Sequence, residues 1–153
     1  MTITTTTHLN LPGTARAALS FYRSVFGGDV RLTTYAEVGM PADAPGADEV
    51  VFGLLHADGG FRLMAYDVPG GDRDALGDAG TTRRENGATI TDRAFFQSLE
   101  GSSLAEVSGL WDALADGATV IEPLAASAWS AGFGMLTDRF GVTWVVGVQP
   151  AAA

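Results

Sequence analysis

The sequence predicts an α+β fold in which the order strand, helix, strand, strand, strand occurs twice. The first observation is an internal repeat: residues 52–55 (FGLL) match residues 133–136 (FGML), and an Asp/Gly turn and a second apolar strand follow each tetrapeptide. The second is a pair of amphipathic helical runs, residues 14–26 and 103–115. The third is the alternation of apolar and polar residues between these runs, which is the period of a pleated strand. Because an internal repeat determines the architecture, we expect two copies of one β-α-β-β-β module.

The first module is expected within residues 1–66. Its helix should begin after Thr14 as N-cap, because a threonine hydroxyl can accept a hydrogen bond from the first helical turn. Strands are expected on both sides of this helix, at residues 4–11, 30–35, 49–57 and 61–66. Thr6, His8 and Asn10 should share one face of the first strand, because successive side chains of a strand point to opposite faces.

Residues 67–89 are expected to connect the modules and residues 90–150 to form the second, the whole chain being one structural domain. The connector is rich in Gly, Asp and Arg and has almost no apolar residues, which favours a long, exposed link. Ser103 and Glu106 have the spacing of a capping box at the start of the second helix. Strands are expected at residues 90–99, 119–121, 129–136 and 142–148, and a loop at 122–127.

The composition excludes several kinds of chemistry. The chain has 153 residues with no cysteine and no lysine, so disulfides, thiolate catalysis, cysteine-ligated zinc and lysine Schiff bases are excluded. Its net charge of −9 argues against a nucleic-acid partner and modestly favours cationic ligands. No apolar run is long enough to span a bilayer, and the first residues do not resemble a signal peptide. We therefore expect a cytoplasmic protein with no membrane partner.

Two such modules in one short chain resemble the vicinal oxygen chelate superfamily, which includes glyoxalase I, bleomycin-resistance proteins and extradiol dioxygenases. The sequence is most similar to the PhnB-like branch, through short motifs spread over nearly the whole chain. These are LNL (9–11), ARAAL (15–19), FY (21–22), FGG (26–28), LMA (63–65), Asp67, PL (123–124), Trp129, FGM (133–135), TDRFG (137–141) and Trp144. The resemblance implies a cupped, half-open mixed β-sheet barrel with helices outside and a ligand cavity inside.

Enzymes of this superfamily usually hold a divalent metal ion with one His or Glu from each of four strands. The resemblance places these four positions at Thr6, Met64, Ala94 and Val145. None of them is a His, Asp or Glu, and His8 beside the first position is a single possible ligand. We therefore expect no metal site and no cofactor. The PhnB-like branch often has a His where Phe52 stands, which puts any role of that His in doubt.

The expected ligand-binding residues combine polar and aromatic side chains that should face the cavity. They are Thr6, His8, Asn10, Phe52, Arg62, Met64, Tyr66 and Trp129. His8 is the candidate for a catalytic base, with a hydrogen-bonded structural histidine as the alternative. Trp129 is expected either at the rim of the cavity or in the core, whereas Trp144 should pack under a helix.

The leading hypothesis is a metal-free small-molecule-binding protein that holds a partly aromatic or amphipathic ligand in the cupped sheet. One alternative is a metal-independent isomerase or lyase with His8 as base. A metal-dependent lyase or dioxygenase would need ligands that the strands do not supply. A methyl donor is not expected, because the sequence has no Gly-rich turn of the nucleotide-binding kind. Exposed sheet edges that a second copy can cover predict a homodimer.

Overall fold

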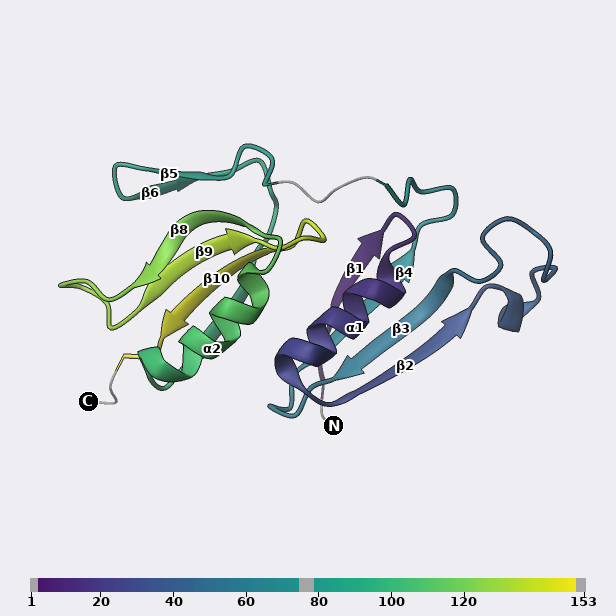
Figure 1. Cartoon of the computed structure of the whole chain (residues 1–153), viewed down its shortest axis with the longest axis horizontal. Coiled ribbons are helices and arrows are strands. Elements are labelled where there is room, and N and C mark those ends of the chain that lie inside the picture. Colours follow the sequence, from purple (N-terminus) through teal and green to yellow (C-terminus); the bar gives the residue numbers. More distant parts are fainter. Residues whose placement is uncertain (1–2, 75–78, 151–153) are drawn as a thin grey trace. The chain divides into compact units, whose positions relative to one another are not determined.

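The chain folds into two units, residues 1–75 and 76–153, and each contains one helix packed on one four-stranded sheet (Figure 1). The computed structural model describes residues 3–74 and 79–150. Within these residues, no helix has the length and apolar character needed to span a membrane.

Unit 1 has its last strand in the middle of its sheet. Its elements are β1 (Thr7–Leu11), α1 (Ala15–Phe26), β2 (Asp29–Thr34), the short 3-10 helix η1 (Ala36–Val38), β3 (Val50–His56) and β4 (Arg62–Asp67). The strand order is β1-β4-β3-β2, in which β1 and β4 are parallel and the other pairs antiparallel.

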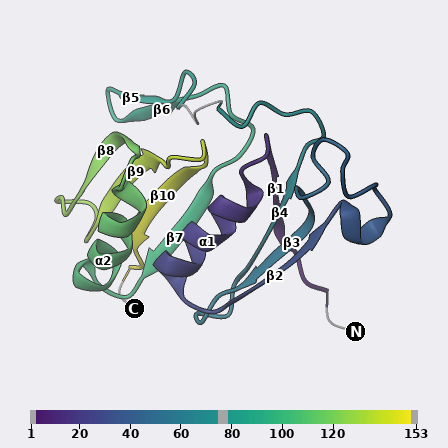
Figure 2. The same cartoon turned by 45° about the vertical axis from the view of Figure 1, so that its right-hand side comes forward.

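Unit 2 repeats this topology. After a small hairpin come β7 (Gln97–Gly101), α2 (Leu104–Ala115), β8 (Thr119–Ala125), β9 (Phe133–Thr137) and β10 (Thr143–Val148). The strand order is β7-β10-β9-β8, again with the outer and last strands parallel. Figures 1 and 2 show α2 lying across this sheet. The correspondence between the two units confirms the α+β fold with a duplicated module, and both sheets are open.

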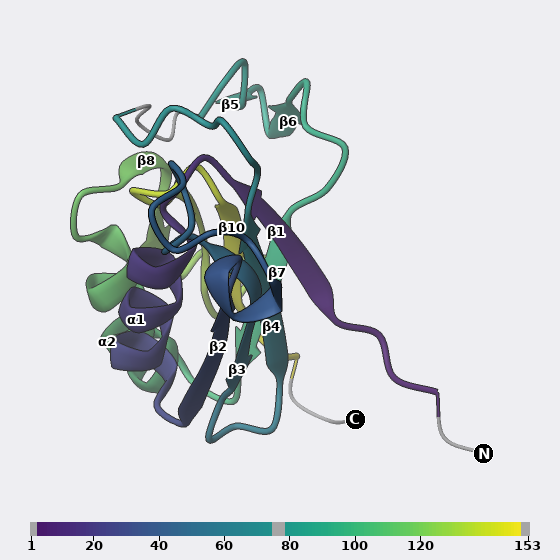
Figure 3. The ribbon, with the colours of Figure 1, turned by 90° about the vertical axis from the view of Figure 1, so that its right-hand side faces the viewer.

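Helix α1 covers one face of the unit 1 sheet, as Figure 3 shows from the side. The helix and the covered face of the strands supply a core of fully or nearly fully buried residues: Leu9, Leu11, Ala15, Ala18, Leu19, Tyr22, Leu55, Leu63 and Ala65. Gly53 lies under the helix, where a Cβ atom would sit 2.4 Å from Leu19 Cδ1. The absence of a side chain at this position therefore sets how closely α1 approaches β3.

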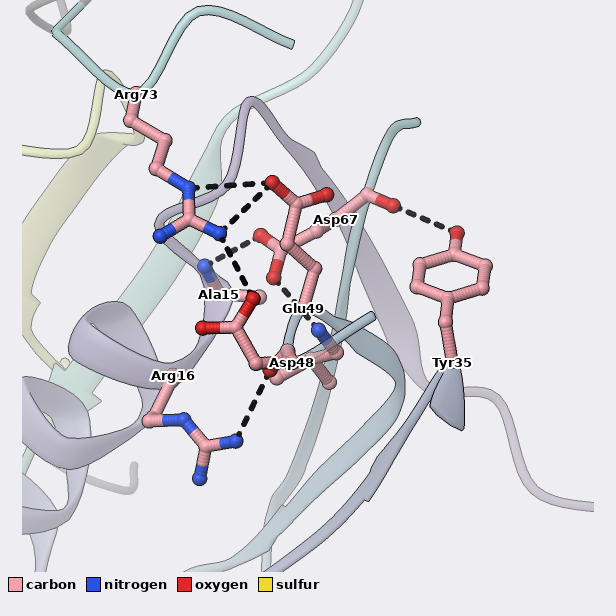
Figure 4. A network of polar contacts seen from close by, with 8 residues as sticks. Ala15, Arg16, Tyr35, Asp48, Glu49, Asp67 and Arg73 are labelled. Carbon is pink, nitrogen blue, oxygen red and sulfur yellow. Dashed lines mark hydrogen bonds and ion pairs between the residues drawn. The ribbon is translucent and has the colours of Figure 1, made fainter. Parts of the chain in front are cut away.

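A buried carboxylate joins three segments of unit 1 (Figure 4). Asp67 is 1% exposed and accepts hydrogen bonds from the backbone N–H groups of Ala15 and Val50, each at 2.8 Å. Its carbonyl oxygen accepts the Tyr35 hydroxyl at 2.8 Å. Thr14 occupies the N-cap position of α1, but its side chain makes no capping hydrogen bond, so this part of the prediction is wrong. The carboxylate is the stronger acceptor, and its charge lies at the positive end of the helix dipole.

In unit 1, Arg73 joins the segment after β4 to the loop before β3 (Figure 4). Arg73 Nη2 lies 3.0 Å from Glu49 Oε1 and 3.4 Å from Asp48 Oδ1. These ion pairs fasten the chain close to residue 74, the last described residue of this stretch.

Unit 2 has its own buried carboxylate, at the turn between β9 and β10. Asp138 is 1% exposed; Oδ1 accepts from the backbone N–H of Phe140 at 2.9 Å and of Val142 at 3.1 Å. Oδ2 accepts from Trp144 Nε1 at 2.9 Å, and Trp144 is 3% exposed. The expectation that Trp144 packs in the core is confirmed, and Asp138 stabilises the turn. Ser103 caps α2 as expected, since its Oγ accepts from the Glu106 N–H at 3.2 Å, whereas Glu106 Oε2 accepts from the N–H of Ser102 at 2.8 Å instead of that of Ser103.

The middle of the chain contains one element that was not expected, and one expected strand is wrong. The stretch expected to connect the modules contains a hairpin of β5 (Arg83–Glu85) and β6 (Ala88–Ile90). Asn86 and Gly87 form its turn with φ of +49° and +78°, as a two-residue hairpin loop requires. The strand expected at residues 90–99 is replaced by the end of β6 and by β7, which starts at Gln97. Ala94 therefore lies outside any strand.

The loop expected at residues 122–127 is also wrong, because β8 continues through Pro123 to Ala125. β8 is an edge strand, where proline is tolerated, and its register with β9 shifts on both sides of Glu122. The strand expected from residue 129 starts only at Phe133, which leaves Trp129 in the preceding loop.

Candidate functional site

The candidate site is the face of the unit 1 sheet that points away from α1, which we term the open face. In the register of the sheet His8 lies beside Met64, and Met64 lies beside Leu54 on its other side. Asn10 pairs with Tyr66 in the same way. Because paired residues point to the same side of a sheet, these side chains share the open face.

Two aromatic rings meet on this face, on the edge strand β1 and its neighbour β4. The rings of His8 and Tyr66 have their centroids 5.3 Å apart and are tilted by 58°. His8 Nδ1 lies 3.3 Å from Asn10 Oδ1. An amide oxygen only accepts, so this contact places a hydrogen on Nδ1, and in the neutral tautomer of that kind Nε2 carries the lone pair. The sequence did not identify Asn10 as the group that orients His8.

The open face also carries apolar surface. Phe52 is 42% exposed, an unusual degree for a phenylalanine inside a strand, and Met64 is half-buried. Thr6 lies just before β1 and is half-buried. All the expected ligand-binding residues of the first module thus lie on the open face or, for Thr6, at its border. This arrangement can hold a flat apolar group and offer it one acceptor and several donors.

The charge of the open face differs from that of the whole chain. Arg62 on β4 and Arg31 on β2 pair with His56 and Leu54 and therefore point to this side. The one acidic residue that the four strands place there is Asp29, opposite His56 at the end of β2. The surface is therefore locally basic, although the net charge is −9.

Tyr35 is a further polar aromatic group close to the open face. Burial raises the pKa of its hydroxyl, and the charges of Tyr66, Asp67 and Glu49 raise that pKa further. Beside it is a pocket of about 140 Å³ formed by Tyr35, Met40, Pro45, Gly46, Glu49, Pro69 and Gly70. Residue types alone did not reveal this pocket, because its walls come from two separate loops.

The residues at the superfamily's metal positions do not suit a divalent metal ion. Met64 offers a thioether between the apolar Leu54 and the imidazole of His8, and Thr6 offers a neutral hydroxyl. In unit 2, Val145 lies in β10 and Ala94 in a loop. Over residues 3–74 and 79–150, no three His, Asp or Glu side chains gather as a potential metal site.

Trp129 belongs to the other unit. It is 71% exposed, which excludes the core as its environment, and its ring centroid lies 5.7 Å from that of Phe133. The guanidinium of Arg84 lies over the Phe133 ring, 5.1 Å from its centroid. Arg84 was missed at the sequence level, because it lies in the stretch expected to be a connector.

Comparison with known proteins identifies the family. The model of the Glyoxalase/Bleomycin resistance protein/Dioxygenase superfamily matches residues 8–146. Protein PA1353 from Pseudomonas aeruginosa is similar in structure, with a TM-score of 0.73 and 31% identity over 97% of this chain and 98% of that chain. A search of curated proteins gave no match.

More distant structures share the fold alone. A Bacillus cereus protein described as a putative 3-demethylubiquinone-9 3-methyltransferase, PhnB protein, has a TM-score of 0.69 and 22% identity over 96% of this chain and 100% of that chain. The fosfomycin resistance protein FosX from Listeria monocytogenes has a TM-score of 0.57 and 9% identity over 99% of this chain and 96% of that chain. The duplicated topology and the match over most of the sequence confirm the resemblance: the chain belongs to the glyoxalase/bleomycin resistance protein/dioxygenase superfamily.

Proposed function

We propose that the protein is a metal-free small-molecule-binding protein that holds its ligand on the open face of unit 1. The carrying observation is the exposed aromatic and polar group there: Phe52 at 42% exposure, with the His8 and Tyr66 rings 5.3 Å apart. Exposed aromatic rings beside a few oriented polar groups are typical of small-molecule sites. Neighbours of similar fold include a protein described by its role in fosfomycin resistance, which is consistent with a small-molecule ligand.

The chemistry of the open face favours a flat, partly aromatic ligand. Phe52 and Met64 provide apolar contact, while the Tyr66 hydroxyl and His8 Nε2 can fix the ligand's orientation. Arg31 and Arg62 outnumber the single carboxylate, so a neutral or anionic ligand suits this face better than a cationic one. The acidic net charge would favour the opposite choice, but exposed charges farther away than about 8 Å are largely screened at physiological salt.

A metal-independent isomerase or lyase is the second candidate function, and one contact favours it. A general base needs an available lone pair, and the contact of His8 Nδ1 with Asn10 Oδ1 at 3.3 Å leaves Nε2 of the neutral ring for that role. In this reading Nε2 would accept a proton from a bound substrate. A turnover assay on any ligand found below would distinguish the two functions, because a binding protein returns the ligand unchanged.

The experiment that tests binding is a thermal-shift screen of small aromatic and amphipathic compounds, followed by mapping on isotopically labelled protein by NMR. A ligand at 100 times its dissociation constant should stabilise the fold by about 2.7 kcal/mol. Signals of His8, Phe52 and Tyr66 should move, and Phe52→Ala should weaken binding about tenfold or more. Phe95→Ala, which removes an equally large ring that is 62% exposed in unit 2, is the matched control. If the compounds bind equally well to both variants, the open face is not the binding site.

The metal-free part of the proposal has its own test. Chelator-treated protein should unfold at the same temperature before and after addition of nickel, zinc, manganese or iron ions, and should hold no stoichiometric metal by mass spectrometry. A tightly bound metal near one per chain would reject the metal-free reading. It would favour a metal-dependent lyase or dioxygenase, with ligands other than the four positions considered above.

A homodimer is also proposed, because each sheet has two edge strands whose backbone groups can pair with another chain. Sedimentation velocity over a range of concentrations should give twice the mass of the chain. A monomer at all concentrations would reject the dimer without affecting the binding proposal.

A further inference from the structure

Unit 2 contains a second group of residues with the character of a binding site, which we term the Arg84 cluster. It consists of Arg84 and Thr89 from the β5–β6 hairpin and Glu122, Phe133 and Met135 from the sheet. Glu122 pairs with Met135 in the sheet, so the cluster lies on the face away from α2. Trp129 borders it, with its ring against Phe133.

Most donors of the Arg84 guanidinium are not used within the cluster. The side chain is 19% exposed, yet its hydrogen bond within the described residues goes from Nη1 to Thr89 Oγ1 at 2.9 Å. Nε is buried and has no hydrogen-bond partner there. Glu122 Oε2 lies 3.8 Å from Nε, within ion-pair distance but too far for a hydrogen bond.

A buried donor without an acceptor is costly, so such a group calls for a partner that the chain itself does not supply, such as a water molecule or an ion. Nε shares one edge of the planar guanidinium with Nη2, the edge that Thr89 does not use. Two parallel donors on one edge match the two oxygens of a carboxylate. The guanidinium carbon also lies 5.1 Å from the centroid of the Phe133 ring, which gives the cation an aromatic neighbour.

We propose that the Arg84 cluster binds an aromatic carboxylate. The carboxylate accepts hydrogen bonds from Nε and Nη2 of Arg84, and the aromatic part of the ligand stacks on the exposed ring of Trp129, which is 71% exposed. Glu122 weakens the binding of the carboxylate, because its negative charge near Arg84 repels the incoming anion. The site belongs to unit 2, so it stands or fails independently of the open face of unit 1.

The test uses the full chain labelled with nitrogen-15 and three probes: 2-naphthoate, the uncharged 2-naphthamide and the non-aromatic cyclohexanecarboxylate. Two-dimensional NMR follows the Nε–H signal of Arg84 and the indole signal of Trp129. 2-Naphthoate should shift both signals to saturation. The amide and the non-aromatic acid should each bind at least about tenfold more weakly, since each lacks one of the two recognised features.

Two charge variants form a matched pair. Arg84→Gln should weaken 2-naphthoate at least about tenfold, whereas Arg83→Gln removes the same charge from the neighbouring, exposed residue and should change the affinity less than about twofold. Glu122→Gln should bind 2-naphthoate more tightly than the wild type. Arg84→Gln also removes contacts of the hairpin, so two variants that keep Arg84 test the proposal separately. Glu122→Gln is the first. Trp129→Ala is the second, and it should weaken binding because the ligand loses its stacking partner.

Several results would overturn the proposal. Equal affinity for 2-naphthoate and 2-naphthamide would show that no anion is recognised. Equal affinities of the Arg84→Gln and Arg83→Gln variants would exclude Arg84 as the contact. Failure of 2-naphthoate to move the Arg84 signal in Glu122→Gln would mean that Nε has no role in binding, whatever happens at the open face.

Discussion

Replacing Asp67 by alanine should destabilise unit 1 far more than a surface substitution does. The carboxylate is 1% exposed and accepts the backbone N–H groups of Ala15 and Val50 at 2.8 Å each. Alanine would leave both donors buried without an acceptor. It would also remove the negative charge from the first turn of α1, which contains no acidic residue of its own.

The size of the effect follows from these contacts. Two unsatisfied buried donors cost about 1–3 kcal/mol each, and the lost charge at the helix N-terminus adds about 0.5–1 kcal/mol. Partial access of water to the cavity reduces the sum, so we expect a loss of about 3–5 kcal/mol. Asp67→Asn should fall about midway, because the amide keeps one acceptor and turns a donor toward the other N–H.

The distribution of aromatic residues allows the two units to be followed separately. All three tyrosines (22, 35 and 66) lie in unit 1, and all three tryptophans (111, 129 and 144) lie in unit 2. Urea unfolding can therefore be recorded by fluorotyrosine NMR for unit 1 and by tryptophan fluorescence for unit 2. With a denaturant slope of about 1 kcal/mol/M for so small a unit, the tyrosine transition of Asp67→Ala should move down by about 3 M or more.

Asp43→Ala is the matched control, since it removes the same charge from an exposed loop of the same unit. It should change the free energy of unfolding of unit 1, read from the tyrosine transition, by less than about 0.5 kcal/mol. If Asp67→Ala and Asp43→Ala unfold at the same urea concentration, the carboxylate does not hold the helix and strand together, and the argument is refuted.

Gly53→Ala should destabilise unit 1 by about 1–3 kcal/mol in the same urea assay, because its Cβ would lie 2.4 Å from the nearest α1 side-chain atom; an unchanged midpoint would mean that α1 shifts freely. Trp144→Phe should lower the stability of unit 2 by about 1–3 kcal/mol, since it loses the hydrogen bond to Asp138 at 2.9 Å, and stability equal to the wild type would contradict this. Hydrogen bonds from the Ser102 hydroxyl and backbone N–H lower the pKa of Glu106. The start of α2 should therefore be stabilised above the ordinary glutamate pKa and lose this support as pH falls through the lowered value. In an NMR pH titration, the amide signal of Ser102 should change position as Glu106 becomes protonated, with a midpoint below the ordinary glutamate pKa. Glu106→Gln should abolish this change.

Periodicity was enough to predict most elements of unit 1 and the second helix. The repeat of FGLL and FGML identified equivalent strands, which the structure places as β3 and β9. Helix starts were less certain, because the cap of α1 comes from Asp67, a residue 52 positions away. No local pattern can reveal a capping group that tertiary structure supplies.

The errors in the second half have local causes. Asn86-Gly87 is a strong two-residue hairpin signal, but the strands on either side have three residues each, and the first, Arg83–Glu85, contains no apolar residue, so neither shows the alternating pattern of a strand. Pro123 indicated a loop, although an edge strand accepts proline. Of the candidate site, strand parity predicted which residues share the open face. The orienting contact from Asn10 and the unsatisfied Nε of Arg84 depend on side-chain geometry that the sequence does not encode locally.

The placement of the last strand inside each sheet has a consequence for how the protein is made. In unit 1, Thr7 pairs with Leu63, so β1 has no neighbour until β4 has left the ribosome and inserted beside it. The apolar side of β1 is meanwhile open to chaperones or to misassembly with other nascent chains. In unit 2, Gln97 pairs with Trp144, so β10 is the one neighbour of β7 in the described sheet. A premature stop before β10 would therefore remove a central strand and leave β7 unpaired. Ribosome stalling late in either unit should thus yield aggregation-prone products, whereas loss of an edge strand would leave most of the pairing intact.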